Sequence, residues 1–237
     1  VVASPQVAEV KRLLRDQADA EAAASSQRFF KEPVSAYGVK SAAVKKIAGQ
    51  VFASLKKRPK AEVLTLCEEL WRSGYIEEVG VACEWSYALR KQYEPGDFEV
   101  FERWLREYVS NWAFCDTLCN HSIAALVEMY PQLVPAVKAW AGSGNRWLKR
   151  GAAVTFIIPA RKGLWLDDLL EIADQLWPDQ DDLVQKGYGW MLKAASEAHP
   201  EKVYEYVLAK KEIMPRTAFR YSLEKMPKEW RDKAMKK

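Results

Sequence analysis

The spacing of apolar residues limits the possible folds of this chain more than any other feature. In the segment 41–58, SAAVKKIAGQVFASLKKR, apolar side chains recur every three to four positions, a period of about 3.6 that is typical of an amphipathic helix. The segments 61–74, 76–93 and 97–112 repeat this spacing, and no Asn-Gly hairpin signal interrupts it. The sequence therefore predicts an all-α protein.

Turn-forming residues divide the chain into about ten to twelve helices of roughly 12–20 residues. Gly74 is expected to cap the helix at 61–74, and Asp97 is expected to be the N-cap of the helix at 97–112. Further helix breaks are expected at proline and glycine residues farther along the chain: Pro131, Gly142, Gly144, Pro159, Pro178, Pro200 and Pro227.

Helices joined by short loops pack as antiparallel pairs. Here successive pairs recur at roughly 35–40 residues, a spacing that fits HEAT-type repeats. Stacked pairs of this kind form a curved solenoid with a concave face. The prediction is a single domain over residues 1–237, built as a HEAT-like α-α superhelix with a basic groove. A globular helical bundle is the alternative that periodicity leaves open.

Composition and charge narrow the possible partners. No apolar run approaches the roughly 20 residues that span a bilayer, and no signal-peptide pattern opens the chain. The chain is therefore expected to be cytoplasmic, without a membrane partner. Its net charge of +4 is a weak indication of a polyanionic partner.

The chain has four cysteines and two histidines, and no CxxC pair. Cys115, Cys119 and His121 could form a zinc site. However, a helix would turn His121 away from both thiols, and buried cysteine is often a small apolar core residue. The sequence therefore predicts free thiols, as in a reducing cytosol, and no metal.

The segment NWAFCD, residues 111–116, combines a large aromatic side chain with an acid. Trp112 and Asp116 are four residues apart, so on a helix they lie only about 40° apart around the axis. Asp116 could instead pair with a nearby arginine or cap a loop, and Trp112 could be an ordinary core residue.

Basic residues gather in the segment 143–163, SGNRWLKRGAAVTFIIPARKG. On a helix Arg146, Arg150 and Arg161 fall near one stripe, and Lys149 lies close to it. Arg150 could equally be a surface residue with a solvated head group. The stripe is the kind of surface that contacts a polyanion.

The segment 184–197, VQKGYGWMLKAASE, places Lys186 and Trp190 on one face of a helix. Gly187 and Gly189 interrupt that helix, and each costs about 1 kcal/mol relative to alanine. Such a cost indicates a close approach, either by a ligand or by a neighbouring helix.

At these residues the chain resembles the AlkD-type alkylpurine DNA glycosylases, a family of DNA alkylation repair enzymes with HEAT-like repeats. The resemblance runs from about Gln27 to about Tyr221. It begins with QRFFKEPVSAYGVKSAAVKKI, continues through NWAFCD and NRWLKRGAAV, and ends with QKGYGWMLKAASEAHPEKVYEYV. Each motif alone is weakly specific, but their order and spacing together are specific.

The resemblance implies roles for four residues that this chain retains. The family's active-site tryptophan and aspartate look like Trp112 and Asp116, its phosphate-contacting arginine looks like Arg150, and its second pocket tryptophan looks like Trp190. The resemblance also implies that Phe29 and Lys40 lie at the DNA. The remaining predicted DNA-binding residues come from the basic stripe and from the face that carries Trp190: Arg146, Lys149, Arg161 and Lys186.

Three positions depart from the family's pattern. Ala113 replaces a second acid, Phe29 replaces a tyrosine and so lacks its hydroxyl group, and Lys40 stands where the family has a neutral amide. A positive charge at Lys40 would either repel a cationic lesion or hold a phosphate. These departures bear on the range of substrates more than on the fold.

The implied activity is the hydrolysis of the N-glycosidic bond of N3- or N7-alkylated purines in double-stranded DNA. Such a base already carries a positive charge, so the enzyme mainly has to stabilise the oxocarbenium-like state of the sugar. A preorganised carboxylate and electron-rich indole faces suit that task, and no cofactor or metal is required. The expected protein is a monofunctional, monomeric, cytoplasmic enzyme that joins the nucleoid when bound to DNA.

Two other functions fit the same architecture. The first is a non-catalytic protein that binds damaged or branched DNA, which Ala113 and Lys40 leave open. The second is a protein-binding helical scaffold, which the basic stripe at 146–161 argues against. Base release would separate the enzyme from the non-catalytic binder, and salt-dependent DNA binding would separate both from the scaffold.

Overall fold

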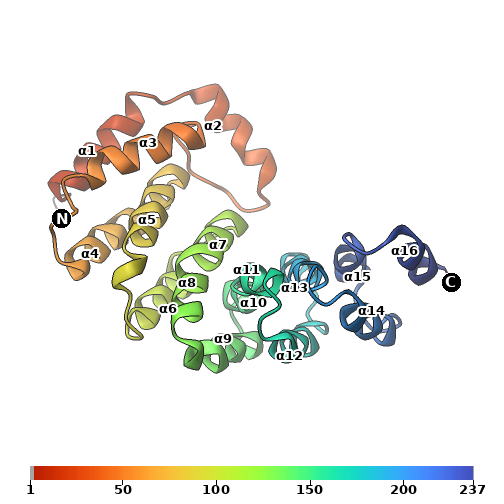
Figure 1. Cartoon of the computed structure of the whole chain (residues 1–237). Helices are drawn as coiled ribbons and strands as arrows, with labels where there is room; N and C mark the ends of the chain where they lie inside the picture. Colours follow the sequence, from red (N-terminus) through yellow and green to blue (C-terminus); the bar gives the residue numbers. More distant parts are fainter. Residues whose placement is uncertain (1–2, 237) are drawn as a thin grey trace. The chain divides into compact units, whose positions relative to one another are not determined.

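A computed structural model describes residues 3–236 as a succession of helices (Figure 1). Its helices belong to two compact units, one that reaches to Ser122 and one that starts at Ile123. Over the described residues no strand is formed, and the β-type pairing is limited to an isolated bridge between Ser35 and Tyr75. The all-α class is thus confirmed, while the single domain and the concave basic groove stay predictions.

The first unit is built around one central helix, α5, which packs against α1, α3, α4 and α7. Its helices are α1 (Pro5–Arg15), α2 (Ala20–Ser26), α3 (Ser41–Phe52), α4 (Lys60–Trp71), α5 (Ile76–Ala88), α6 (Asp97–Glu107) and α7 (Trp112–Leu118). Large aromatic side chains fill its core: Trp71, Trp85, Phe101 and Trp104 are almost fully buried.

The second unit has the same plan around α13, which contacts α10, α11, α12, α14 and α15. Its helices are α8 (Ala124–Met129), α9 (Val134–Ala139), α10 (Arg146–Val154), α11 (Ile157–Arg161), α12 (Leu166–Leu176), α13 (Asp182–Ala195), α14 (Pro200–Ala209), α15 (Arg216–Leu223) and α16 (Lys228–Met235). This all-helical packing is consistent with a helical-repeat solenoid.

Most of the observed helices are shorter than the expected 12–20 residues. Their lengths range from 5 residues in α11 to 14 in α13, and α3, α4, α5 and α13 reach the expected range. The helix expected at 41–58 ends at Phe52, and the helix expected at 97–112 ends at Glu107. Asp97 is not an N-cap, because it is the first residue of α6. Its carboxylate accepts hydrogen bonds from Glu94 N at 2.7 Å and from Lys60 Nζ at 2.8 Å.

Gly189 allows α13 to pack directly against the backbone of α15. A Cβ atom at this position would lie 2.8 Å from Tyr221 Cβ, closer than such atoms approach, and 3.0 Å from Ala218 Cα, which is also unusually tight. The structure thus supports the helix-packing explanation for this glycine, and no ligand is needed to account for it.

Glu68 of α4 links that helix to α6. Its carboxylate accepts two hydrogen bonds of 2.7 Å from Arg103, one of 2.7 Å from Arg72 and one of 3.1 Å from Tyr108. The pKa of Glu68 is lowered to about 2, mainly because Arg103 donates two of these hydrogen bonds to its carboxylate. Its contribution to stability is therefore present above the usual carboxyl pKa and is lost as the pH falls through about 2.

Buried carboxylates anchor the loop between α2 and α3. Glu77, only 4% exposed, accepts the backbone N–H groups of Tyr37, Gly38 and Val39 at 2.8–3.0 Å. The hydroxyl group of Tyr37 donates to the buried Glu78 at 2.7 Å. Hydrogen bonds to charged groups are worth about 1.5–3 kcal/mol each, so this end of the loop is held firmly.

All four cysteines are buried and free. Burial raises the pKa of the Cys67 and Cys83 thiols. His121, in contrast, is exposed, and its ring lies at a tilt of 55° against Tyr87 with the ring centroids 5.3 Å apart. Across residues 3–236, no group of three or more histidine, cysteine or acidic side chains could hold a metal ion.

No helix within the described residues is both long enough and apolar enough to cross a membrane.

Candidate functional site

The segment NWAFCD forms the start of α7. Asn111 is the N-cap, and its side chain accepts a hydrogen bond of 3.0 Å from the backbone N–H of Phe114. Phe114 and Cys115 face the core, while Trp112 and Asp116 are half-buried. Because they are four residues apart on a helix, Trp112 and Asp116 are neighbours on one face of α7, as the sequence predicted.

A loop from the N-terminal part of the first unit fixes the indole of Trp112. The indole Nε1–H donates to the backbone carbonyl of Phe29 at 3.1 Å, and the ring stacks on Phe30 with a centroid separation of 5.4 Å. Phe29 as a residue is 62% exposed, and the Arg28 guanidinium lies 5.1 Å from the centroid of its ring. The structure therefore brings Phe29 and Trp112 together through a backbone contact.

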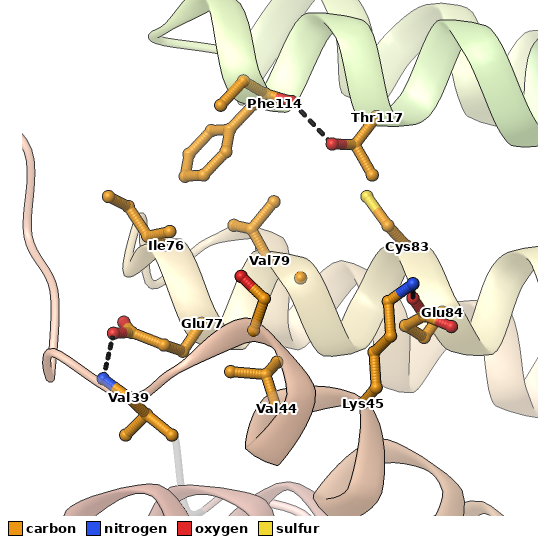
Figure 2. Close-up of a pocket in the computed structure, with 13 residues that line it drawn as sticks. Val39, Val44, Lys45, Ile76, Glu77, Val79, Cys83, Glu84, Phe114 and Thr117 are labelled. Atoms are coloured by element: carbon orange, nitrogen blue, oxygen red, sulfur yellow. Dashed lines mark hydrogen bonds and ion pairs between the residues drawn. The ribbon is translucent and has the colours of Figure 1, made fainter. Parts of the chain in front are cut away.

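Behind this face, α7 borders a cavity of about 260 Å³ (Figure 2). Ala113, Phe114 and Thr117 contribute to its wall, together with residues of α3 and α5. Lys45 and Glu84 form an ion pair of 3.5 Å at this cavity. The cavity lies beside Ala113, which according to the resemblance replaces a second acid of the family.

Lys40 is exposed and is the N-cap residue of α3, with its backbone carbonyl accepting from Ala43 N at 2.8 Å. No hydrogen bond or ion pair of its side chain occurs in the described part of the chain. The first unit thus contains four of the predicted site residues, namely Phe29, Lys40, Trp112 and Asp116.

Arg150 of α10 lies inside the packing of the second unit. The residue is 5% exposed, and its guanidinium Nη1 donates to the backbone carbonyl of Leu183. A Cβ atom on Gly187 would lie 3.3 Å from Arg150 Cγ. Gly187 therefore makes room for the aliphatic stem of Arg150 between α10 and α13.

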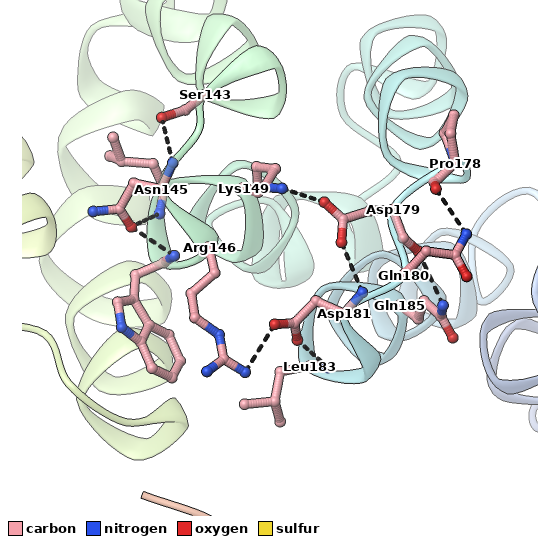
Figure 3. Close-up of polar contacts among 12 residues, drawn as sticks. Ser143, Asn145, Arg146, Lys149, Pro178, Asp179, Gln180, Asp181, Leu183 and Gln185 are labelled. Atoms are coloured by element: carbon pink, nitrogen blue, oxygen red, sulfur yellow. Dashed lines mark hydrogen bonds and ion pairs between the residues drawn. The ribbon is translucent and has the colours of Figure 1, made fainter.

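The other predicted DNA-binding cations of the second unit all pair with acids. Arg146 pairs with Asp181 at 2.8 Å, and Lys149 pairs with Asp179 (Figure 3). The remaining two pairs are Lys186 with Asp182 at 3.1 Å and Arg161 with Glu197 at 3.5 Å. The stripe that the sequence marks as basic is thus largely neutralised by carboxylates.

Three of these four acids, all except Glu197, come from one short segment, WPDQDD at 177–182, which leads into α13. Asp181 also caps α13, because its side chain accepts from Leu183 N at 2.9 Å. The sequence analysis missed this segment, although three aspartates within four positions are visible. What the sequence does not show is that they lie opposite the cations of α10.

Trp190 is half-buried on α13, directly after Gly189. It belongs to the second unit, as do Arg146, Lys149, Arg150, Arg161 and Lys186. The predicted catalytic set therefore draws Trp112 and Asp116 from one unit and Trp190 from the other.

The burial of Arg150 leads to a prediction on stability. Arg150→Ala should lower the free energy of unfolding by about 2–3 kcal/mol, because it removes a charge-assisted hydrogen bond to Leu183 and leaves a gap beside Gly187. Urea denaturation would measure this. Arg146→Ala is the matched control and should cost less, because that side chain is 36% exposed. Equal losses for the two variants would contradict the structural role of Arg150.

Comparisons with known proteins agree with this architecture. The sequence matches the family described as "DNA alkylation repair enzyme" over residues 10–226. No curated protein matches it. Among solved structures it is similar to a chain described as "Predicted DNA alkylation repair enzyme from Enterococcus faecalis". The two share 19% sequence identity and a TM-score of 0.81, and the match covers 90% of this chain and 98% of the other. At that identity, the likeness shows the fold.

Proposed function

Because the chain belongs to the DNA alkylation repair enzyme family, we propose that it is a monofunctional DNA glycosylase that removes cationic N3- and N7-alkylated purines from double-stranded DNA. The observation that carries this proposal is the start of α7. There an indole held by Phe29 and Phe30 stands one helical turn from the Asp116 carboxylate.

The chemistry of the lesion matches what these two side chains offer. An alkylated purine leaves readily because it departs as a neutral base, so positive charge develops on the sugar. In this proposal the Asp116 carboxylate stabilises that charge and orients or deprotonates the attacking water. The faces of Trp112 and Trp190 each add about 0.5–2 kcal/mol of attraction for a cationic centre.

The tight positioning of Trp112 supports a role in preorganisation. A side chain fixed by both a hydrogen bond and a ring stack loses little entropy when it meets the lesion. Phe29 and Lys40 would contact DNA from the first unit. Arg150 would hold a phosphate beside the lesion only after its buried guanidinium group leaves the backbone carbonyl of Leu183. The cations Arg146, Lys149, Lys186 and Arg161 can reach phosphates only if DNA displaces their carboxylate partners.

The second candidate function is a non-catalytic DNA-binding protein on the same fold. Two observations favour it: Ala113 offers no second acid beside Trp112, and the cations opposite the 177–182 segment are already paired. Retention of both Trp112 and Asp116 favours the enzyme.

Base release tests the proposed function directly. The purified protein is incubated with a methylated duplex, and the released bases are identified by chromatography. We expect 7-methylguanine and 3-methyladenine to appear with single-turnover kinetics and without strand cleavage. Binding of the duplex without release of either base would refute the glycosylase and leave the non-catalytic alternative.

A further inference from the structure

The positive charge of this protein is concentrated at its C-terminal end. Residues 210–237 contain ten lysines and arginines against four acids, a net charge of +6. The preceding 209 residues contain 26 basic against 28 acidic residues, a net charge of −2. The whole excess of +4 therefore comes from the last 28 residues, whereas the predicted DNA-binding residues all lie before them.

Four of these cations stand on the exposed sides of α15 and α16. Arg216 and Arg220 are one turn apart on α15, and Lys228 and Arg231 are three residues apart on α16. We refer to these four residues as the C-terminal basic surface. Arg220, Lys228 and Arg231 line an open groove of about 400 Å³, and Arg216 and Arg220 border a second hollow of about 310 Å³.

The cations of this surface lack acidic partners. Considering residues 3–236, no side-chain hydrogen bond or ion pair involves any of the four. Two acids, Glu224 and Asp232, also line the groove. Glu224 already forms an ion pair of 2.7 Å with Lys193, so Asp232 is the remaining acid that could offset the charge of these cations. This differs from the cations at 146–186, each of which faces a carboxylate or a carbonyl group.

We propose that the C-terminal basic surface binds the sugar-phosphate backbone of double-stranded DNA and supplies much of the sequence-independent affinity. The inference rests on the proposed function for the choice of DNA as the polyanion. Duplex DNA carries one negative charge per roughly 1.7 Å of its axis, so a row of free cations can bind it anywhere along its length. A cation that already forms an ion pair must first separate from its carboxylate partner before it can contact a phosphate.

The location of the surface gives it a distinct role. Lys228 and Arg231 lie beyond residue 226, where the match to the family ends. Because the helices that carry the surface pack through buried residues such as Phe219, Leu223 and Ala234, the cations can change without disturbing the core. The surface therefore sets how strongly the protein holds undamaged DNA, separately from the reaction at α7.

A charge-removal experiment tests this. The variant carries Arg216→Ala, Arg220→Ala, Lys228→Ala and Arg231→Ala, and anisotropy measures its binding to an undamaged 20-base-pair duplex at several salt concentrations between 50 and 200 mM. Each lost phosphate contact lowers the slope of log affinity against log salt by about 0.9. We expect the slope to fall by about 3 to 4 units. Arg216→Lys combined with Arg220→Lys should keep the wild-type slope.

A matched control separates a local surface from overall charge. Lys46→Ala, Lys56→Ala, Lys57→Ala and Lys91→Ala remove four exposed lysines of the first unit, and their side chains make no hydrogen bond or ion pair in the described chain. This control should bind with nearly the wild-type slope. Equal slopes for the control and the surface variant, whether both lowered or both unchanged, would overturn the inference.

Vesicles rich in phosphatidylserine provide a second comparison. If the surface variant loses vesicle binding but keeps duplex binding, the surface is for lipid and the inference is wrong.

Base release distinguishes this inference from the proposed function. With protein far above the dissociation constant, the surface variant should release bases at the wild-type single-turnover rate. If the wild type releases no base while the surface variant still loses duplex affinity, the glycosylase proposal fails and the surface stands. If bases are released and the surface variant keeps the wild-type salt slope, the surface inference alone fails.

Discussion

Asp116→Asn is expected to release 7-methylguanine from a defined duplex about 100- to 1,000-fold more slowly than the wild type. Asparagine has nearly the same shape, so α7 should fold and DNA should still bind. It lacks the negative charge, so the oxocarbenium-like state loses its fixed counter-charge. The loss of one preorganised electrostatic group costs about 2.7–4 kcal/mol in the barrier. Single-turnover release at saturating protein is the measurement.

Asp167→Asn is the matched control, because Asp167 is an exposed acid in the first turn of α12. It should release the base at the wild-type rate. The defect of Asp116→Asn should also be smaller for lesions with very labile bonds, since these need less stabilisation. If Asp116→Asn and the wild type release 7-methylguanine equally fast, Asp116 is a structural acid and the catalytic role of α7 is wrong.

Gly38→Ala is expected to lower the free energy of unfolding by about 3–5 kcal/mol. Gly38 has a φ of +81°, and a Cβ atom there would lie 2.1 Å from Asp19 O and 2.6 Å from Ala23 N. These two atoms form a backbone hydrogen bond at the start of α2, so neither can withdraw without breaking it. A left-handed conformation and overpacking each cost about 1–3 kcal/mol.

Urea denaturation of Gly38→Ala and Gly49→Ala compares two chemically identical changes. Gly49 lies inside α3, and a Cβ atom there meets nothing within 4 Å. Gly49→Ala should therefore raise stability by up to about 1 kcal/mol through helix propensity. If Gly38→Ala is as stable as the wild type, the loop does not pack against α2 as described.

Periodicity predicted which faces of the helices are buried but not where the helices end. The helix expected at 61–74 is observed at Lys60–Trp71. Here the spacing of the apolar residues and the position of Gly74 both indicate nearly the same end of the helix. The helix expected at 97–112 is interrupted instead, and Asn111 starts α7 with its own side-chain cap. The role of Asp97 could not be predicted, since its partner Lys60 is 37 residues away.

For the candidate site, contacts within one helix were predictable and contacts between helices were not. Trp112 and Asp116 share a face because four residues make about one helical turn. The pairing of Lys149 with Asp179 joins residues 30 positions apart, and no local pattern reveals it. The partner of Trp112 was also hidden, because the contact with Phe29 spans 83 positions.

The burial of all four cysteines makes the protein convenient for site-specific labelling. Thiolate, not thiol, reacts with maleimides, and Cys67 and Cys83 are kept protonated by their surroundings. A cysteine introduced at an exposed position of α16, as in Lys228→Cys, should therefore take up a fluorophore far faster than the native ones. A dye could thus be attached to the folded protein without first replacing the native cysteines.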